Sequence, residues 1–245
     1  MPETATVTRS TSSTPVIITI DGPAGTGKST VSHRLAQRLG LEFLDTGAMY
    51  RAITLLAINE GIDPADGEAV ADAALHAELH FDWTTSPPRI MLGEQDVGER
   101  IREHDVNHVV SVVAAQSRVR EVLVDLQRRI ASRHPRLVTE GRDQGSVVFP
   151  DAPVRFFLHA AVDVRANRRA NQMQQAGRDV DRDRLVDEIR RRDHLDSTRS
   201  DGPLTRPDGA VDIDTNALTI DEVVDVLERE VRLRLPKLGS DACST

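Results

Sequence analysis

Apolar residues follow two different periods along the chain, and their alternation predicts an α/β fold. Short β-branched and aliphatic runs, typical of buried strands, occur at 16–20, 42–44, 137–139, 154–158 and 211–213. Apolar residues three and four positions apart predict helices at 31–39, 48–59, 106–115, 118–132, 163–176, 182–195 and 219–235. Strands that alternate with helices indicate a parallel core sheet covered by helices on both faces.

The remaining segments predict how the chain is organised around this core. Residues 62–103 combine a weak helical pattern with a hairpin around a Pro-Pro tip, so we expect an insertion beside the core. Ser117 is expected to cap the helix that follows it, and Thr219 begins a capping-box pattern. We predict one domain over 15–235, a disordered tail at 1–14 and a loose tail at 236–245.

A phosphate-binding motif, G-x-x-x-x-G-K-[ST], lies between the first strand and the first helix. In such a loop the backbone N–H groups curl around a phosphate, and the helix N-terminus adds partial positive charge. Lys28 is expected to reach the β- and γ-phosphates, and the Ser29 hydroxyl to hold Mg²⁺. The motif predicts a nucleoside triphosphate site formed by Gly22, Pro23, Ala24, Gly25, Thr26, Gly27, Lys28, Ser29 and Thr30.

Composition narrows the partners and the compartment. The 245 residues carry a formal net charge of −8, which argues against nucleic acid and acidic membranes as partners. Only Lys28 and Lys237 among the 31 basic residues are lysines, so the loop lysine stands out in an arginine-rich chain. The one cysteine, Cys243, cannot form an internal disulfide, and no apolar run is long enough to span a membrane. We therefore expect a cytoplasmic protein.

Three classes of protein share the phosphate-binding loop: switch GTPases, mechanical ATPases and kinases of small molecules. The sequence lacks the Asn-Lys-x-Asp motif that reads guanine, and a motor would need partner surfaces and usually a longer chain. Phosphoryl transfer to another phosphate needs arginines to offset the repulsion between two anions. It needs no base, because a phosphomonoester is already largely dianionic at pH 7. A nucleoside monophosphate kinase is the favoured hypothesis.

Two clusters at strand ends carry this hypothesis, since ligands of open parallel sheets gather at that edge. Thr46 and Arg51 follow the second strand and could hold a second phosphate; the alternative is a helix cap beside a surface arginine. Glu140-Gly141-Arg142-Asp143 follows the third core strand, where P-loop proteins often place a carboxylate that orients Mg²⁺-bound water. The alternative for this run is a plain tight turn.

A third cluster lies near the end of the chain. Arg192, Asp196 and Arg199 share one helical face, where they could bind a ligand or form an ion pair within the helix. A lid and a solvated face are equally expected for the preceding cluster of Arg165, Arg168 and Arg169.

Two other functions remain open at this point. A kinase of a non-nucleotide acceptor, such as a sugar acid, would need a base, and Asp45 or Asp143 would have to serve. A nucleotide-sensing module would bind the triphosphate without turnover, and Arg142 would then matter little.

Over roughly residues 15–235 the sequence resembles the bacterial cytidylate kinase family. The resemblance is carried by Asp45-Thr46-Gly47-Ala48-Met49-Tyr50-Arg51, by 140–150, by the Arg192-Asp193 stretch that includes Asp196 and Arg199, and by Ile20-Asp21-Gly22-Pro23 leading into the loop. It implies a five-stranded parallel core, a monophosphate-binding insertion at 62–103 and an arginine-bearing helical lid at about 160–200. It also implies ATP with Mg²⁺ as donor and CMP or dCMP as acceptor. We expect a monomer.

The resemblance also implies a role for individual residues. Thr46, Arg51 and Arg142 would hold the acceptor phosphate, and Arg192 with Asp196 would contact the sugar. Ser111, Arg120 and Asp143 would read cytosine, which requires a break between the two helices that carry Ser111 and Arg120. The residues expected to act in phosphoryl transfer are Lys28, Arg142, Arg192 and Arg199.

Overall fold

A five-stranded parallel sheet forms the centre of the computed structural model, which describes residues 14–238 except 176, 178 and 179. Its strands lie in the order β2-β6-β1-β7-β8. They are β1 (Val16–Asp21), β2 (Glu42–Asp45), β6 (Arg136–Gly141), β7 (Val154–His159) and β8 (Val211–Asp214). The predicted parallel α/β core is confirmed. Each strand extends past its apolar run, because polar residues at its ends still pair in the ladder.

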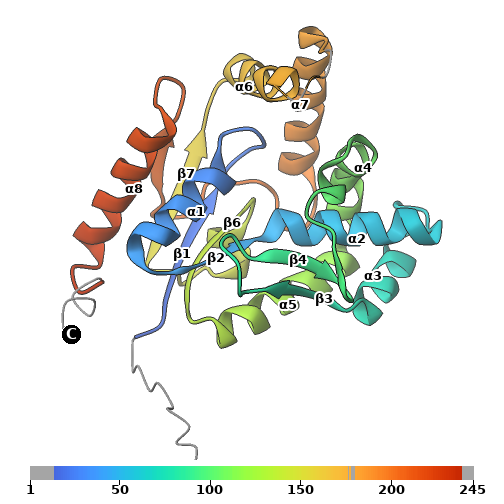
Figure 1. The fold of residues 1–245 in the computed structure, drawn as a ribbon, viewed down its shortest axis with the longest axis horizontal. Coiled ribbons are helices and arrows are strands. Elements are labelled where there is room, and N and C mark those ends of the chain that lie inside the picture. The colour runs from blue at the N-terminus through green and yellow to red at the C-terminus, as the bar shows by residue number, and fades with distance from the viewer. Residues whose placement is uncertain (1–13, 176, 178–179, 239–245) are drawn as a thin grey trace, which may run out of the picture.

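Helices cover both faces of this sheet (Figure 1). The helices α1 (Lys28–Leu39) and α8 (Ile220–Arg234) bury an aliphatic cluster with Ile18, Ile20 and Phe156. On the opposite face α2 (Thr46–Glu60) and α5 (Ser117–Arg133) pack over a second cluster. The helices α3 (Gly67–His76) and α4 (His104–Ala114) pack against α2 and α5 and contribute to the same cluster. Because helices pack on both faces of the sheet, its position is fixed, and the carboxyl ends of its strands lie along one defined edge.

A second, antiparallel sheet lies in the segment expected to be an insertion. It consists of β3 (Leu79–Asp82), β4 (Arg89–Leu92) and the short β5 (Gln95–Asp96), followed by the 3₁₀ turn Arg100–Arg102. The predicted hairpin is therefore present. Trp83 stacks on His134 with ring centroids 3.9 Å apart, and Ser86 at the hairpin tip lies 3.0 Å from the His33 ring. These contacts hold the small sheet against α5 and α1.

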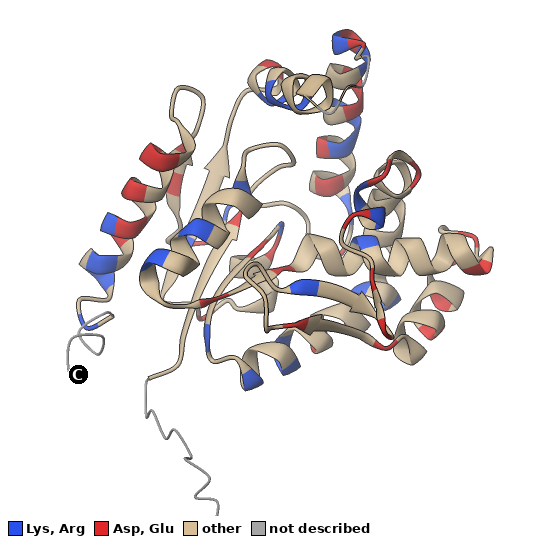
Figure 2. Cartoon of the chain, viewed as in Figure 1, with Lys and Arg blue, Asp and Glu red and all other residues tan. Residues whose placement is uncertain are grey.

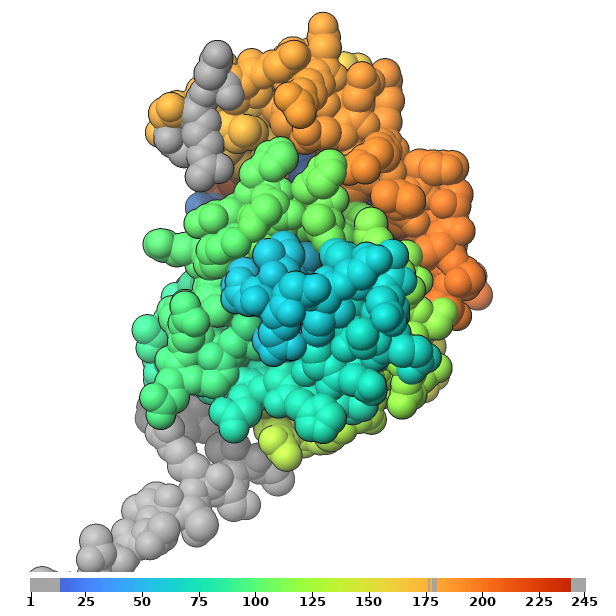
Figure 3. All heavy atoms as spheres, turned by 90° about the vertical axis from the view of Figure 1, so that its right-hand side faces the viewer, coloured from blue at the N-terminus to red at the C-terminus, as the bar shows by residue number. Residues whose placement is uncertain are grey.

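The helices α6 (Val162–Gln175) and α7 (Arg182–Thr198) pack side by side as a hairpin above the core (Figures 1 and 3). Arg165 is 3% exposed, so the solvated-face interpretation is wrong for this residue. It donates to Asp193 of α7 at 2.6 and 3.0 Å, and to the Ala24 carbonyl in the glycine loop at 3.0 Å. One arginine thus ties the helical hairpin to the phosphate-binding loop.

Two expected helix caps have different outcomes. The capping box at Thr219 is confirmed, since Thr219 and Glu222 each bond to the other's backbone N–H. Ser117 is not an N-cap: it is the first residue of α5, and its hydroxyl donates to the Asp201 carboxylate instead. A carboxylate distant in the sequence thus binds the Ser117 hydroxyl in place of a backbone N–H of the same helix. The chain still breaks between α4 and α5, as the site prediction required.

Figure 2 shows acidic and basic residues mixed along α7 and α8, as expected of solvated helix faces, whereas the charged residues of α1 are all basic. Within 14–238, excluding the three residues left out, no helix is both long and apolar enough to cross a membrane. The predicted tails lie outside the described residues except for Thr14 and 236–238.

Candidate active site

The glycine-rich loop follows β1 at the centre of the sheet and ends where α1 begins, at Lys28. Gly22, Gly25 and Gly27 have φ angles of 149°, 81° and 91°, a region that side chains disfavour. A β-carbon on Gly22 would collide with the Leu158 carbonyl of β7. The glycines therefore allow the chain to turn between β1 and the N-terminus of α1, where helix N–H groups favour an anion.

Lys28 lies beneath this loop, 5% exposed, and its Nζ donates to the Pro23 carbonyl at 2.8 Å. Burial, together with the positive charge of Arg142, lowers the pKa of Lys28 to about 7. The next residue, Ser29, donates its hydroxyl to the Glu140 carboxylate of β6 at 2.7 Å. The predicted loop residues and the run after the third core strand thus meet across the sheet edge.

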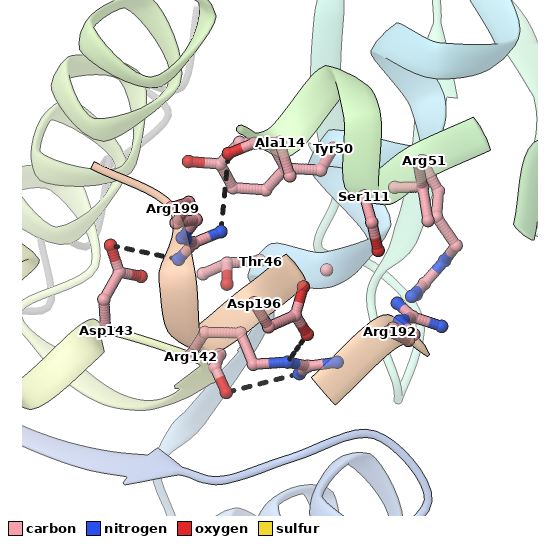
Figure 4. A pocket seen from close by; sticks show the side chains of 13 residues that line it. Thr46, Tyr50, Arg51, Ser111, Ala114, Arg142, Asp143, Arg192, Asp196 and Arg199 are labelled. Atoms are coloured by element: carbon pink, nitrogen blue, oxygen red, sulfur yellow. Dashed lines mark hydrogen bonds and ion pairs between the residues drawn. The ribbon is translucent and has the colours of Figure 1, made fainter. Parts of the chain in front are cut away.

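A pocket opens beside the loop, between the ends of β2 and β6 and the helices α2, α4 and α7 (Figure 4). Seven of the eight residues predicted to bind the acceptor line it, as does Arg199, which also comes from the sequence-predicted set. These residues are Thr46, Arg51, Ser111, Arg142, Asp143, Arg192, Asp196 and Arg199. Segments more than 150 positions apart in the sequence are therefore brought to one cavity.

Arginines dominate the charge of this pocket. Four arginines and two aspartates line it, which leaves two positive charges in excess. Arg142 donates to Asp196 at 2.8 Å, while Arg51 and Arg192 reach toward each other (Figure 4). Burial and the neighbouring Arg142 charge lower the pKa of Arg192 to about 10.

Several of these arginines keep a hydrogen-bond donor to spare. Among the described residues, the Nε atoms of Arg51 and Arg192 and the Nη2 atom of Arg199 are buried without a hydrogen-bond partner. Buried donors without acceptors are costly. The pocket is therefore built to receive an anion with several acceptor oxygens.

The other end of the pocket is organised around Asp143. Its carboxylate pairs with Arg120 and lies 3.8 Å from Arg199, and Arg120 also donates to the Tyr50 hydroxyl at 3.3 Å. Arg120 lies behind Asp143 and is not among the lining residues, which corrects its expected direct place in the cavity. The reason is tertiary: Gly202, in the segment after α7, covers the Arg120 guanidinium.

Replacing Gly202 with alanine is expected to raise KM for the acceptor about tenfold and to destabilise the fold by about 1–3 kcal/mol. Gly202 has φ of 54°, and a β-carbon there would overlap both Arg120 and Asp143. Steady-state kinetics and thermal unfolding measure the two effects. Gly209→Ala is the matched control, since Gly209 has φ of 69° and its nearest neighbour is Arg155 at 3.5 Å. An equal rise in KM for both variants would contradict the conclusion that Gly202 shapes the pocket through Arg120 and Asp143.

Tyr50 is a pocket residue that the sequence reasoning did not select, although the motif around it was singled out. It lies four residues after Thr46 on α2, and that spacing places the two on one face of a helix. Burial raises the pKa of Tyr50 to about 12, so its hydroxyl keeps its proton. Helical periodicity applied to the motif would have found it.

The glycine loop at the carboxyl edge of a parallel sheet, with an arginine-lined pocket next to it, defines a P-loop kinase. The family model described as cytidylate kinase matches residues 18–233. A protein named cytidylate kinase from Mycolicibacterium paratuberculosis is 48% identical over 222 residues, which are 91% of this chain and 97% of that protein. Another protein of that name, from Corynebacterium glutamicum, is 48% identical over 212 residues, which are 86% of this chain and 92% of that protein. The chain belongs to the cytidylate kinase family.

Among solved structures, a shikimate kinase from Bacteroides thetaiotaomicron matches 89% of this chain and 98% of its own length. Its TM-score is 0.46 and its sequence identity 14%, so it carries no argument about the substrate.

Proposed function

We propose that this chain transfers the γ-phosphoryl group of MgATP to CMP or dCMP, giving CDP or dCDP and ADP. The observation that carries the proposal is the charge of the pocket beside the glycine loop. Two positive charges in excess, and the buried Nε donors of Arg51 and Arg192 that have no hydrogen-bond partner, match a phosphomonoester dianion, which offers several acceptor oxygens. The relatives named cytidylate kinase support the same acceptor.

The acceptor phosphate would lie among Arg51, Arg142 and Arg192. Arg142 is positioned for this by Asp196, which holds its Nε and leaves the other end of the guanidinium toward the pocket. Thr46 donates its hydroxyl to the Glu140 carbonyl at 2.7 Å, so its oxygen is fixed at the pocket wall. Positioning and charge neutralisation are what phosphoryl transfer requires.

Cytosine would be read by Asp143 and Ser111. The exocyclic amine of cytosine is a donor, and a carboxylate is an acceptor-only partner. Uracil presents an acceptor at that place, which would leave the buried Asp143 carboxylate facing another oxygen. In this proposal Arg120 acts through Asp143, whose carboxylate it orients.

Ser29 and Glu140 fit the Mg²⁺ that the reaction uses. Their oxygens lie 2.7 Å apart beside the glycine loop, and hydroxyl and carboxylate oxygens are ligands that Mg²⁺ prefers. In the part of the chain that the structure describes, no group of three or more His, Cys, Asp or Glu could hold a metal. Ser29 would therefore bind Mg²⁺ together with the phosphates, and Glu140 would orient its water. The ion would neutralise charge on the transferring group.

The proposal extends to the predicted parts of the domain. Residues 62–103 would form the monophosphate-side insertion, and about 160–200 the lid that closes over the substrates and excludes water. The hydrogen bond from Arg165 to the Ala24 carbonyl supports a lid whose position depends on the glycine loop. A monomer acting in the cytoplasm completes the proposal.

A kinase of a sugar acid is less well supported, because neither candidate base is free. Asp45 caps α2 and pairs with Arg51 at 3.1 Å; although burial opposes it, the Arg51 charge holds its pKa below the usual value. Asp143 pairs with Arg120. A carboxylate held by arginines is a weak general base.

The test is an ADP-release assay with MgATP and equal concentrations of CMP, dCMP, UMP, AMP and shikimate. Fast turnover is expected only with CMP and dCMP. Comparable turnover of UMP would contradict the cytosine readers, and turnover of shikimate would favour the sugar-acid hypothesis. Binding of ATP without turnover of any acceptor would overturn the kinase and support a nucleotide sensor.

A further inference from the structure

Asp21 is a completely buried carboxylate that the proposed reaction does not use. It is the last residue of β1, directly before Gly22, and it pairs in the ladder with Gly141 of β6. A glycine-rich phosphate-binding loop does not require an aspartate directly before its first glycine, so the loop motif alone does not explain Asp21. Its position between the donor loop and the run that carries Arg142 calls for an explanation.

The Asp21 carboxylate bonds to the backbone immediately after Asp143. One oxygen accepts from the Gln144 N–H at 2.8 Å and the other from the Gly145 N–H at 2.7 Å. These N–H groups open the π-helical turn Gln144–Val148, and the first N–H groups of a helical turn have no partner within it. Asp21 therefore caps this turn from a neighbouring strand.

Asp143 occupies the N-cap position of the same turn, and aspartate there ordinarily caps its own helix. Its side chain makes no such bond. It faces Arg120 and Arg199 at the pocket instead. An external cap leaves the local aspartate available for another role.

The turn is also held tightly in place by its surroundings. A β-carbon on Gly145 would lie 2.7 Å from the Thr19 hydroxyl oxygen of β1. The Gln144 amide accepts from Thr139 at 2.9 Å and donates to Gln127 at 3.0 Å. The turn that follows Asp143 thus has one defined position against β1 while its cap is present.

We propose that Asp21 is a positioning residue for the acceptor: its carboxylate caps the Gln144–Val148 turn in place of Asp143 and so keeps Arg142 and Asp143 facing the pocket. The proposal rests on the proposed function for the identity of the acceptor. In this proposal the end of β1 connects the glycine loop, which binds the donor, to Arg142 and Asp143, which bind the acceptor.

The ionisation of Asp21 supports this role. Burial, with a smaller contribution from the Asp143 charge, raises its pKa to about 7, although its two backbone hydrogen bonds and Lys28 oppose the shift. An aspartate in an unfolded chain ionises near pH 4. Between about pH 4 and 7 the folded state therefore binds a proton that the unfolded state has lost, and this group's contribution to stability falls as pH rises. A carboxylate that reduces stability at neutral pH is expected where function requires it.

The experiment compares Asp21→Asn with the wild-type enzyme at saturating MgATP from pH 6 to 8.5. An amide can accept through only one of its two atoms, so KM for CMP should rise about ten- to a hundredfold at pH 8.5. At pH 6 the wild-type carboxyl is itself protonated, so the ratio of the two KM values should fall to within about threefold of one. The titration of CMP cancels in that ratio.

Two results would overturn the proposal. A KM for CMP that equals the wild-type value at every pH would remove Asp21 from acceptor positioning. A variant that loses ATP binding with KM for CMP unchanged would assign Asp21 to the donor loop. Asp66→Asn is the matched control, since Asp66 caps α3 away from the pocket, accepting from Ala69 N–H at 3.0 Å.

A measurement on the wild-type protein needs neither substrate nor a folded variant. The amide proton shifts of Gln144 and Gly145 should titrate together with a midpoint near pH 7, because both bond to one carboxylate. Two amide shifts that titrate with different midpoints would contradict a cap formed by one carboxylate. Failure of the CMP assay with titrating amides would instead fault the proposed function.

Discussion

Replacing Arg142 with alanine is expected to lower kcat/KM for CMP about a thousandfold and to leave the Kd for MgATP nearly unchanged. Arg142 comes from the end of β6, lines the pocket and is held by Asp196 at 2.8 Å. Its loss removes a preorganised charge at the phosphoryl group and also leaves the buried Asp196 carboxylate with one partner fewer. Steady-state kinetics with CMP and ATP titration of each protein measure the two quantities.

The matched control is Arg38→Ala. Arg38 also pairs with an aspartate, at 2.5 Å to Asp225, but on the exposed surface between α1 and α8. Its removal should leave turnover within about twofold of wild type. An Arg142→Ala enzyme that keeps its turnover would remove the acceptor-phosphate site from this pocket and favour the nucleotide sensor.

Replacing Asp143 with asparagine is expected to reduce the preference for CMP over UMP by at least about a hundredfold. Arg120 and Arg199 would hold the amide oxygen, so the amide NH₂ would turn toward the base. Cytosine would then meet a donor where it presents a donor, and uracil would meet a donor where it presents an acceptor. The ratio of kcat/KM values for CMP and UMP measures the change.

Asp212→Asn serves as the control for this prediction, because Asp212 pairs with Arg206 at 2.7 Å on the surface. That variant should keep the wild-type preference. If Asp143→Asn lowers the rate with CMP and UMP equally, Asp143 orients the arginines without reading the base.

Local patterns sufficed for the parts of the site that lie close together in the sequence. The glycine loop is continuous, and its conformation follows from glycines at positive φ and the helix that begins at Lys28. The face shared by Arg192 and Asp196 follows from helical spacing, and both line the pocket. Arg199 also lines it, but it follows α7 as an extended C-cap residue and is not part of the helix as expected.

Local sequence patterns could not predict the interactions between distant segments. The cap expected at Ser117 is wrong because Asp201, 84 positions away, binds its hydroxyl. Arg120 was expected in the cavity, but Gly202 covers it. The tie from Arg165 to the Ala24 carbonyl spans 141 positions. No local propensity specifies such a contact, because each depends on which strands and helices become neighbours.

The sequence by itself determined the α/β class, the triphosphate loop and an excess of arginine for an anionic acceptor, because these follow from residue type and short-range spacing. The tertiary structure decided which arginines are neutralised and which keep free donors, and it placed Asp21 under the turn after Asp143. The physical reason is that burial and charge pairing arise between segments that only the strand order β2-β6-β1-β7-β8 brings together.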